Sequence, residues 1–216
     1  MTERLRLATF NVHHCRGRDG VLDVARTAAV VSSSRAEVVA LQEVDRGLGR
    51  SGGVDQPSEL ARLTGLEVSF WPTLARTGGE YGLALAAPER LEAVVESLPR
   101  VGAEEPRIAV VARIGGLSVV ATHLSTDPTA RALQSERVAS LAALLAPPVV
   151  VVGDLNQTRR RLRPFRRRGF RPVRAGAWWR RPIDHVVLGP GLGHAGAEAI
   201  ATVASDHPIV VVDLAF

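Results

Sequence analysis

The chain has 216 residues, a length that suits a single domain with a sizeable core, and we predict one domain over residues 1–216. No apolar run approaches the ~20 residues of a membrane span, and the N-terminus lacks an apolar secretory segment. These features argue against membrane insertion and favour a cytoplasmic location. The single cysteine, Cys15, excludes an internal disulfide framework and a cysteine metal cluster.

The charge is strongly basic, with a formal net charge of +5 and an isoelectric point near 10.9. All 27 basic residues are arginine, and seven of them fall within the ten residues 159–168. Such a balance favours polyanionic partners, including nucleic acids and phosphoinositides. Two explanations that need no polyanionic partner remain open: an arginine-rich codon bias for the whole chain, and a solvated helix face for the run.

The first half of the chain alternates predicted strands with short helices. Gly65 is placed to end a helix, and Gly78-Gly79 predicts a turn between two strands. The predicted elements are strands over 4–12, 37–41, 66–72 and 81–86, helices over 21–33 and 57–64, and a long loop over 45–56.

The second half contains the clearest strand and helix signals. Gly115-Gly116 lies between two apolar runs and predicts a hairpin, and an alanine- and leucine-rich segment predicts a helix. The predicted elements are strands over 91–98, 108–114, 117–122, 149–152, 183–188 and 209–214, a helix over 129–145, an arginine-rich helix or turn over 158–168, and an irregular segment over 171–181 that contains Trp178-Trp179. Interleaved strands and helices with hairpins predict an α/β (α+β) fold with mixed sheets covered by helices.

The stretch from Val149 to Asn156 joins four consecutive valines to Gly153, Asp154, Leu155 and Asn156. The valines predict a strand buried on both faces, so the carboxylate and carboxamide follow where that strand leaves the core. Polar side chains in this position are typical of binding and catalytic sites in α/β proteins. Taken alone, the pattern fits equally well an Asx turn that caps the next helix.

The same pattern recurs at six predicted strands, each of which has polar residues at or near one end. An unpartnered buried charge costs several kcal/mol, so these groups are expected to meet one another or a metal ion. Carboxylates and carboxamides without cysteine suit Mg²⁺ or Mn²⁺, and histidines beside carboxylates suit proton transfer and stabilisation of phosphoryl oxygens. The set predicts hydrolysis of a phosphoester.

Six short motifs in this order resemble those of the endonuclease/exonuclease/phosphatase superfamily, over nearly the whole chain. They are Thr9-Phe10-Asn11, Leu41-Gln42-Glu43-Val44, Thr122-His123-Leu124, Gly153-Asp154-Leu155-Asn156, Ile183-Asp184-His185 and Ser205-Asp206-His207-Pro208. The resemblance implies a four-layer α/β/β/α sandwich, in which two mixed β-sheets pack face to face with helices outside. It also implies a divalent-metal-dependent phosphoester hydrolase.

The resemblance further implies roles for the metal-binding residues. Glu43 is the expected principal ligand of Mg²⁺ or Mn²⁺. Asn11 is expected close to the ion, and Asp206 is a further candidate ligand.

The catalytic residues follow from the same resemblance. Asp154 is expected to position or deprotonate the attacking water, and Asn156 to hold that water or a phosphate oxygen. His207, oriented by Asp184, contacts the scissile phosphate or acts as base or acid; the choice of base between Asp154 and His207 stays open. His123 stabilises the transition state or protonates the leaving group.

Four further residues are candidates for substrate binding. Strand alternation puts His13 on the same face as Asn11 and predicts that His14 points elsewhere, as it does for His185 relative to Asp184. Arg50 follows the metal-binding motif in a loop, and Arg107 precedes a strand near the expected substrate. Tyr81 is a weaker candidate, because the asparagine expected shortly after it is replaced by Leu83-Ala84.

The substrate is the least determined part of the prediction. The basic charge favours a phosphodiesterase or nuclease that acts on DNA or RNA. We expect the protein to be a monomer. The alternatives are a phosphatase or phosphodiesterase of a small or lipid-derived phosphate, such as an inositol phosphate or a sphingomyelin-type headgroup, and a catalytically inactive relative that binds phosphate compounds or a partner.

Overall fold

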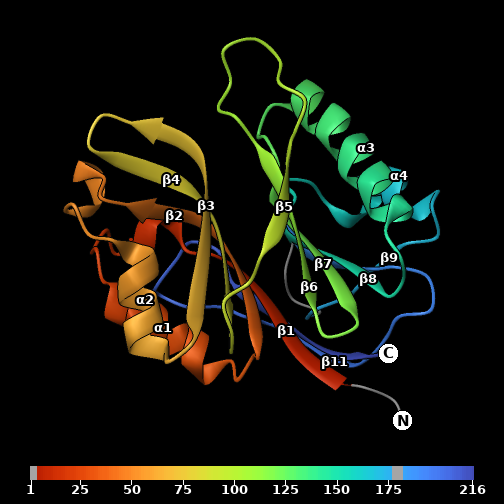
Figure 1. The fold of residues 1–216 in the computed structure, drawn as a ribbon, viewed down its shortest axis with the longest axis horizontal. Helices are drawn as coiled ribbons and strands as arrows, with labels where there is room; N and C mark the ends of the chain where they lie inside the picture. Colours follow the sequence, from red (N-terminus) through yellow and green to blue (C-terminus); the bar gives the residue numbers. More distant parts are fainter. Residues whose placement is uncertain (1–3, 177–181) are drawn as a thin grey trace.

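A computed structural model describes residues 4–176 and 182–216 and contains two six-stranded mixed sheets (Figure 1). The first sheet has the strand order β11-β12-β1-β2-β4-β3 and the second β5-β6-β7-β8-β10-β9. The strands of the first sheet are β1 (Arg4–Asn11), β2 (Val38–Arg46), β3 (Glu67–Arg76), β4 (Gly79–Ala87), β11 (Gly193–Ile200) and β12 (Ile209–Ala215). Those of the second are β5 (Ala93–Ser97), β6 (Ile108–Ile114), β7 (Leu117–His123), β8 (Val149–Asp154), β9 (Arg171–Pro172) and β10 (Asp184–Leu188).

Helices cover the outer face of each sheet. Figure 1 shows α1 (Val24–Ser33) and α2 (Gln56–Thr64) on one side of the molecule, and α3 (Pro128–Leu144) and α4 (Arg163–Arg166) on the other. Short 3₁₀ turns are η1 (His13–Cys15), η2 (Gly49–Ser51) and η3 (Arg159–Arg161). The predicted four-layer α/β/β/α sandwich is confirmed.

Three hydrophobic clusters correspond to the three interfaces between these layers. The central cluster joins the two sheets, with Leu7 of β1 and Val38 of β2 in the same cluster as Val150 of β8. The second lies under α1 and α2, and the third under α3 and α4. Every β8 valine is therefore buried, alternately toward the other sheet and toward α3, which explains the unbroken apolar run.

Several element boundaries differ from the predictions. The helix predicted from residue 21 begins at Val24, because Asp23 caps it by accepting a hydrogen bond from the Arg26 amide at 2.9 Å. The loop predicted over 45–56 contains the end of β2 and the turn η2. Strand β11 was not predicted, since its sequence is rich in glycine and alanine rather than β-branched residues. Residues Trp178-Trp179 lie outside the described part of the chain.

Among the described residues, no helix is long and apolar enough to cross a membrane.

Candidate functional site

Strand direction brings the predicted polar residues to one edge of the sandwich. Strand β1 runs parallel to β2, and β7 runs parallel to β8, so the four strands end at a common edge. Strands β10 and β12 run antiparallel to β8 and β1, so their beginnings meet the same edge. Six residues arrive there from six strands or from the loop just before one: Asn11, Glu43, His123, Asp154, Asp184 and His207.

Strand alternation turns four of these side chains inward, between the sheets: Asn11, His123, Asp154 and Asp184. On β1, Asn11 has the same parity as Leu7, and on β8, Asp154 has the same parity as Val150, both of which belong to the central cluster. The amide nitrogen Nδ2 of Asn11 donates to Glu43 Oε1 at 3.0 Å and to Asp154 Oδ2 at 3.1 Å. Asn11 therefore links a carboxylate of its own sheet to a carboxylate of the opposite sheet.

Glu43 reaches this cluster through an irregularity in β2. Regular alternation would place it with Val39 and Leu41, which pack under the helices. The β2–β4 register shifts between Leu41 and Val44, and Glu43 has a φ of 60°. A bulge of this kind re-aims a side chain, and here it directs the Glu43 carboxylate to Asn11.

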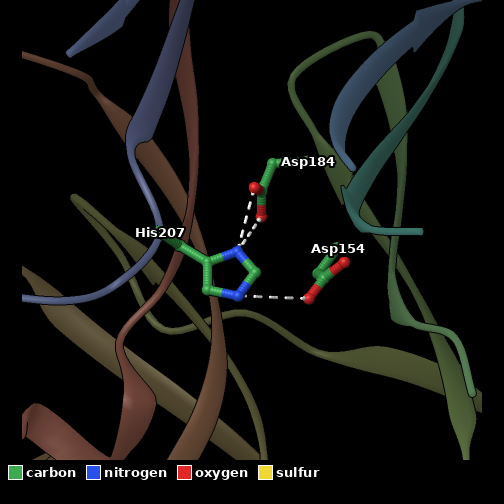
Figure 2. Close-up of side chains that lie close together, drawn as sticks. All are labelled: Asp154, Asp184 and His207. Carbon is green, nitrogen blue, oxygen red and sulfur yellow. Dashed lines mark hydrogen bonds and ion pairs between the residues drawn. The ribbon is translucent and has the colours of Figure 1, made fainter. Parts of the chain in front are cut away.

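His207 lies between two carboxylates, as Figure 2 shows. Its Nδ1 is 3.0 and 3.1 Å from the two oxygens of Asp184, and its Nε2 is 3.8 Å from Asp154 Oδ2. Asp184 and Asp154 are direct partners in the β8–β10 register, which explains why both face one imidazole. Because His207 precedes β12, it carries this contact from the first sheet to the second.

The electrostatics of this group favour a protonated imidazole. Burial opposes the charge on His207, but the hydrogen bond to Asp184 and the charges of Asp184 and Asp154 raise its pKa to about 9. Burial, followed by the Asp184 charge, raises the pKa of Asp154 to about 7. Side-chain atoms of Asp154, Asp184 and His207 lie within 4.8 Å of one another, a spacing that a metal ion could span. Both ring nitrogens of His207 face carboxylates, an arrangement that suits proton transfer.

His123 has the opposite electrostatic character. Burial and then the nearby Arg107 hold its pKa well below the usual value, so the ring is neutral. Its Nδ1 is 3.1 Å from Nη1 of Arg107, which has no acceptor, so Nδ1 must accept and the ring proton must be on Nε2. That nitrogen is 3.5 Å from Asp154 Oδ2 and points at the cluster. His123 is thus built as a neutral hydrogen-bond donor.

Asn156 follows β8 in a left-handed conformation, with φ 50°. Its amide N–H donates to Asp154 Oδ1 at 2.9 Å, and its side-chain Nδ2 donates to the carbonyl of Leu124 at 2.8 Å. The same Nδ2 is also 3.2 Å from His123 Nε2; because both nitrogens carry hydrogen, this contact is not a hydrogen bond. Asn156 therefore restrains the Asp154 carboxylate and contributes a polar side chain beside His123.

A cavity of about 240 Å³ opens over this cluster. Arg50, Tyr81 and Arg107 stand along it: Arg107 donates to the Tyr81 hydroxyl at 3.3 Å, and the Arg50 guanidinium lies 5.2 Å from the Tyr81 ring centroid. Arg50 is held by the buried Asp45 at 2.7 and 2.8 Å. The lining residues are His14, Glu43, Arg50, Tyr81, Glu105, Arg107, His123, Thr126, Asp154, Asn156 and His207.

Of the two histidines that follow Asn11, His14 lines the cavity and His13 does not. The expectation that His14 points away from the cavity is wrong, because its Nε2 is 3.3 Å from Glu43 Oε2 and it lines the cavity. His13 lies outside that lining, beside Asp206, with 3.7 Å between Nδ1 and Oδ1. Alternation fails here because β1 ends at Asn11 and both histidines have positive φ.

Asp206 lies at the periphery of the cluster, with a side chain that is 57% exposed. Among the described residues, its side chain contacts only His13 and Ser205 at the distances that define ion pairs and hydrogen bonds. Its assignment as a metal ligand stays a prediction. By contrast, Asn11 and Asp154 are almost fully buried, and Glu43 is partly so.

Backbone strain is concentrated at the site. Within the described part of the chain, six residues other than glycine have positive φ, and three of them, His14, Glu43 and Asn156, line the cavity. Such conformations cost roughly 1–3 kcal/mol each and persist where the surrounding structure imposes them. The positions of Glu43 and Asn156 therefore lower the stability of the folded protein.

The donor set fits a hard divalent cation. Glu43 presents one carboxylate oxygen to Asn11 and the other toward His14, at the floor of an open polar cavity. Oxygen donors without a thiolate suit Mg²⁺ or Mn²⁺, which retain water and take phosphate oxygens as further ligands. Glu43, with Asn11 beside it, is the group in this cluster that could hold such an ion.

Comparisons with known proteins give a consistent picture. A family model described as "Endonuclease/Exonuclease/phosphatase family" matches residues 8–207. Similar solved structures include an endonuclease/exonuclease/phosphatase from Beutenbergia cavernae DSM 12333, with 23% identity, a TM-score of 0.79, and coverage of 98% of this chain and 71% of that one. A search of curated proteins found no match.

Two further similar structures carry activities in their names. One is the mannosyl-6-phosphatase Bt3783 of Bacteroides thetaiotaomicron VPI-5482, with 16% identity, a TM-score of 0.73, and coverage of 98% of this chain and 100% of that one. The other is ANGEL2, a 2′,3′-cyclic phosphatase, with 12% identity, a TM-score of 0.70, and coverage of 100% of this chain and 96% of that one. At these identities the likeness concerns the fold.

Proposed function

The chain belongs to the endonuclease/exonuclease/phosphatase family, and we propose that it hydrolyses phosphoesters with a divalent cation, Mg²⁺ or Mn²⁺, bound at Glu43. The observation that carries the proposal is the hydrogen-bonded link from Glu43 through Asn11 to Asp154. It sets a candidate ion site directly beside a candidate base, each from a different sheet. When bound, the cation would neutralise phosphate charge and polarise the scissile ester.

The chain's own residues supply the proton transfers. Asp154 has a raised pKa, lies among donors and faces the cavity, which suits a base that positions and deprotonates the attacking water. His207, protonated and oriented by Asp184, suits a contact to the scissile phosphate or donation of a proton to it. We therefore assign the base to Asp154 and the cationic donor to His207.

The remaining donors stabilise negative charge. His123 presents its Nε2–H, Asn156 an amide, and Arg107 a guanidinium along the same cavity. Donors preorganised toward a developing oxyanion contribute a large part of phosphoryl-transfer catalysis. The neutral state of His123 favours stabilisation of the transition state over protonation of the leaving group.

We propose a phosphodiester of DNA or RNA as the substrate class. The net charge of +5 supports an extended polyanion. Arg50 and Arg107 line the cavity, although Asp45 and Glu105 pair with them. Hydrolysis of a small or lipid-derived phosphate remains the alternative, and the name of one neighbour, a mannosyl-6-phosphatase, belongs to the small-phosphate class. Binding to nucleic acid would weaken steeply with salt, whereas binding of a small phosphate would show a shallow slope.

The test is a phosphoester panel with Mg²⁺ and with Mn²⁺: plasmid DNA, an abasic oligonucleotide, inositol phosphates, sphingomyelin and a chromogenic diester. Asp154→Asn and Glu43→Gln are expected to lower the rate on the hydrolysed substrate by at least ~10²-fold, because each removes a charged group from the cluster. Glu67→Gln, at an exposed position on β3, is the matched control and retains activity.

Full activity of Asp154→Asn would contradict the proposed role. A wild-type protein that binds phosphate compounds but hydrolyses nothing in the panel would favour an inactive binding relative. From the sequence, we also propose that residues 1–216 form one domain, and that the protein is a monomer located in the cytoplasm. Size-exclusion chromatography would test the monomer, and cell fractionation would test the location.

A further inference from the structure

A second, larger cavity adjoins the catalytic cluster on the far side of Asp184. It has a volume of about 650 Å³, and Asp184 and Pro208, the residue after His207, are part of its lining. Arginines 159, 160 and 174 line it as well. The cavity therefore shares a wall with the Asp184–His207 pair and is basic on another side.

These three arginines differ from Arg167 and Arg168, at the end of the arginine run. Arg167 and Arg168 form ion pairs with Glu136 of α3, at 3.2 and 2.5 Å. Within residues 4–176 and 182–216, no carboxylate lies within ion-pair distance of Arg159, Arg160 or Arg174. Arg167 and Arg168 thus fasten the segment after α4 to α3. Arg159 and Arg160, at the start of the run, line the cavity without counter-charge.

The one carboxylate in the described lining of this cavity, Asp184, is already paired with His207. Both oxygens of Asp184 contact His207 Nδ1, so its charge is paired within the catalytic cluster. Burial, followed by the charges of Arg174 and Arg166, lowers the pKa of Arg159, as expected where guanidinium groups crowd together without an anion.

The positive surface also extends beyond this cavity. Arg159 and Arg174 line a neighbouring hollow of about 530 Å³ together with Arg171 and His194. An anion bound here would be contacted by side chains of η3 and of the segment after β9. Planar guanidinium groups are well suited to phosphate because they donate two parallel hydrogen bonds.

We propose that this cavity is a second phosphate site, which holds another phosphate group of the same substrate whose ester is cleaved at Asp154 and His207. The inference rests on the proposed function, since it takes the smaller cavity as the place of hydrolysis. It predicts that the preferred substrate carries at least two phosphates close together. A nucleic-acid backbone and a multiply phosphorylated small molecule share this chemistry.

The experiment compares ligands that differ by one or more added phosphates, by calorimetry in EDTA so that no turnover occurs. Thymidine 3′,5′-bisphosphate is paired with thymidine 5′-monophosphate, and inositol 1,4,5-trisphosphate with inositol 1-phosphate. We expect the wild type to prefer the more phosphorylated ligand of one pair at least tenfold in Kd. The pair that shows the preference identifies the source of the second phosphate.

The test variant is Arg159→Gln/Arg174→Gln, and the control is Arg90→Gln/Arg113→Gln. The control removes the same charge from arginines that line a separate cavity of about 500 Å³, which also includes Glu89 and Glu92. The preference should fall to less than threefold in the test variant and persist in the control. If the test variant unfolds, Arg174→Gln alone, at an exposed position after β9, replaces it.

No preference by the wild type in either pair, including no measurable binding, overturns the inference, and so does an equal loss in both double variants. Hydrolysis of bis-p-nitrophenyl phosphate with Mg²⁺ is measured separately. A protein that shows the preference but hydrolyses no ester would overturn the proposed function and leave the second phosphate site standing. A protein that hydrolyses the diester but shows no preference would support the proposed function and overturn the second phosphate site.

Discussion

At the scale of single residues, His207 and His123 show how one site keeps two imidazoles in different states. His207 has carboxylates on both ring nitrogens, at 3.0 Å and 3.8 Å, which favour its charge. His123 is buried against Arg107, which excludes a charge. The site therefore holds a cationic and a neutral donor, both near Oδ2 of Asp154.

Asp184→Asn tests the role of the carboxylate that positions His207. An asparagine keeps the shape but removes the charge that holds the imidazolium in place, so kcat should fall by at least ~10²-fold with little change in KM. The pH–rate profile should also shift, because the pKa of His207 loses its main support. Asp213→Asn, which breaks a surface pair with Arg6, is the control. A loss of kcat with an unchanged pH profile would contradict a positioning role.

The stability of the metal-free protein should fall as the pH rises. His207 has a folded-state pKa of about 9, above the usual ~6.5, so its contribution is complete below pH ~6.5 and is lost through pH 9. Asp154 has a pKa raised to about 7, so the folded state favours its proton and stability declines between pH ~4 and 7. Both act in the same direction.

Thermal unfolding in EDTA between pH 5 and 9 measures this effect. Asp184→Asn should flatten the decline, since Asp184 raises the pKa of both groups. An equally steep decline in the variant would show that other groups are responsible.

At the scale of elements, the bulge in β2 is the feature on which the candidate ion site depends. Glu43 takes a φ of 60° within a strand whose other inward positions follow regular alternation. Glycine adopts this conformation without penalty, whereas a residue with a Cβ pays roughly 1–2 kcal/mol.

Glu43→Gly should therefore be more stable than Glu43→Ala, by about 1 kcal/mol, although both lose activity. In a regular strand the order is reversed, because glycine is the more destabilising residue there. Denaturant unfolding of the two variants decides between these orders. An alanine variant that is the more stable of the two would mean that the bulge relaxes once the carboxylate is gone.

At the scale of the whole molecule, the site is assembled across the two sheets. Asn11, Glu43 and His207 come from the first sheet, and His123, Asp154 and Asp184 from the second. A cation bound at this junction would stabilise the folded protein, because the unfolded chain has no such cluster.

Adding 5 mM Mg²⁺ to the EDTA-treated protein should raise Tm, and Glu43→Gln should abolish the increase. Glu67→Gln, which alters a carboxylate far from the cluster, should preserve it. An increase of the same size in Glu43→Gln would place the ion elsewhere.

The sequence by itself determined the fold class, the family and the residues that meet at the sheet edge. These follow from local patterns. Apolar strands such as Val149–Val152 indicate the core, and the polar residues that follow several such strands are expected to gather where the strands end. Strand β11 escaped prediction, because its hydrogen-bonded pairing with β12 compensates for weak β propensity.

Only the tertiary structure decided which histidine faces the cavity, how Glu43 is turned inward, and which arginines lack a counter-charge. Positive φ angles at His14 and Glu43 break the two-residue period on which any alternation argument depends. The arginine run reads as one feature in the sequence, yet Glu136, distant along the chain, pairs with one end of it and leaves the other end facing the cavity. The directions of these side chains and the pairing of these arginines depend on contacts between residues far apart in sequence, which no local pattern encodes.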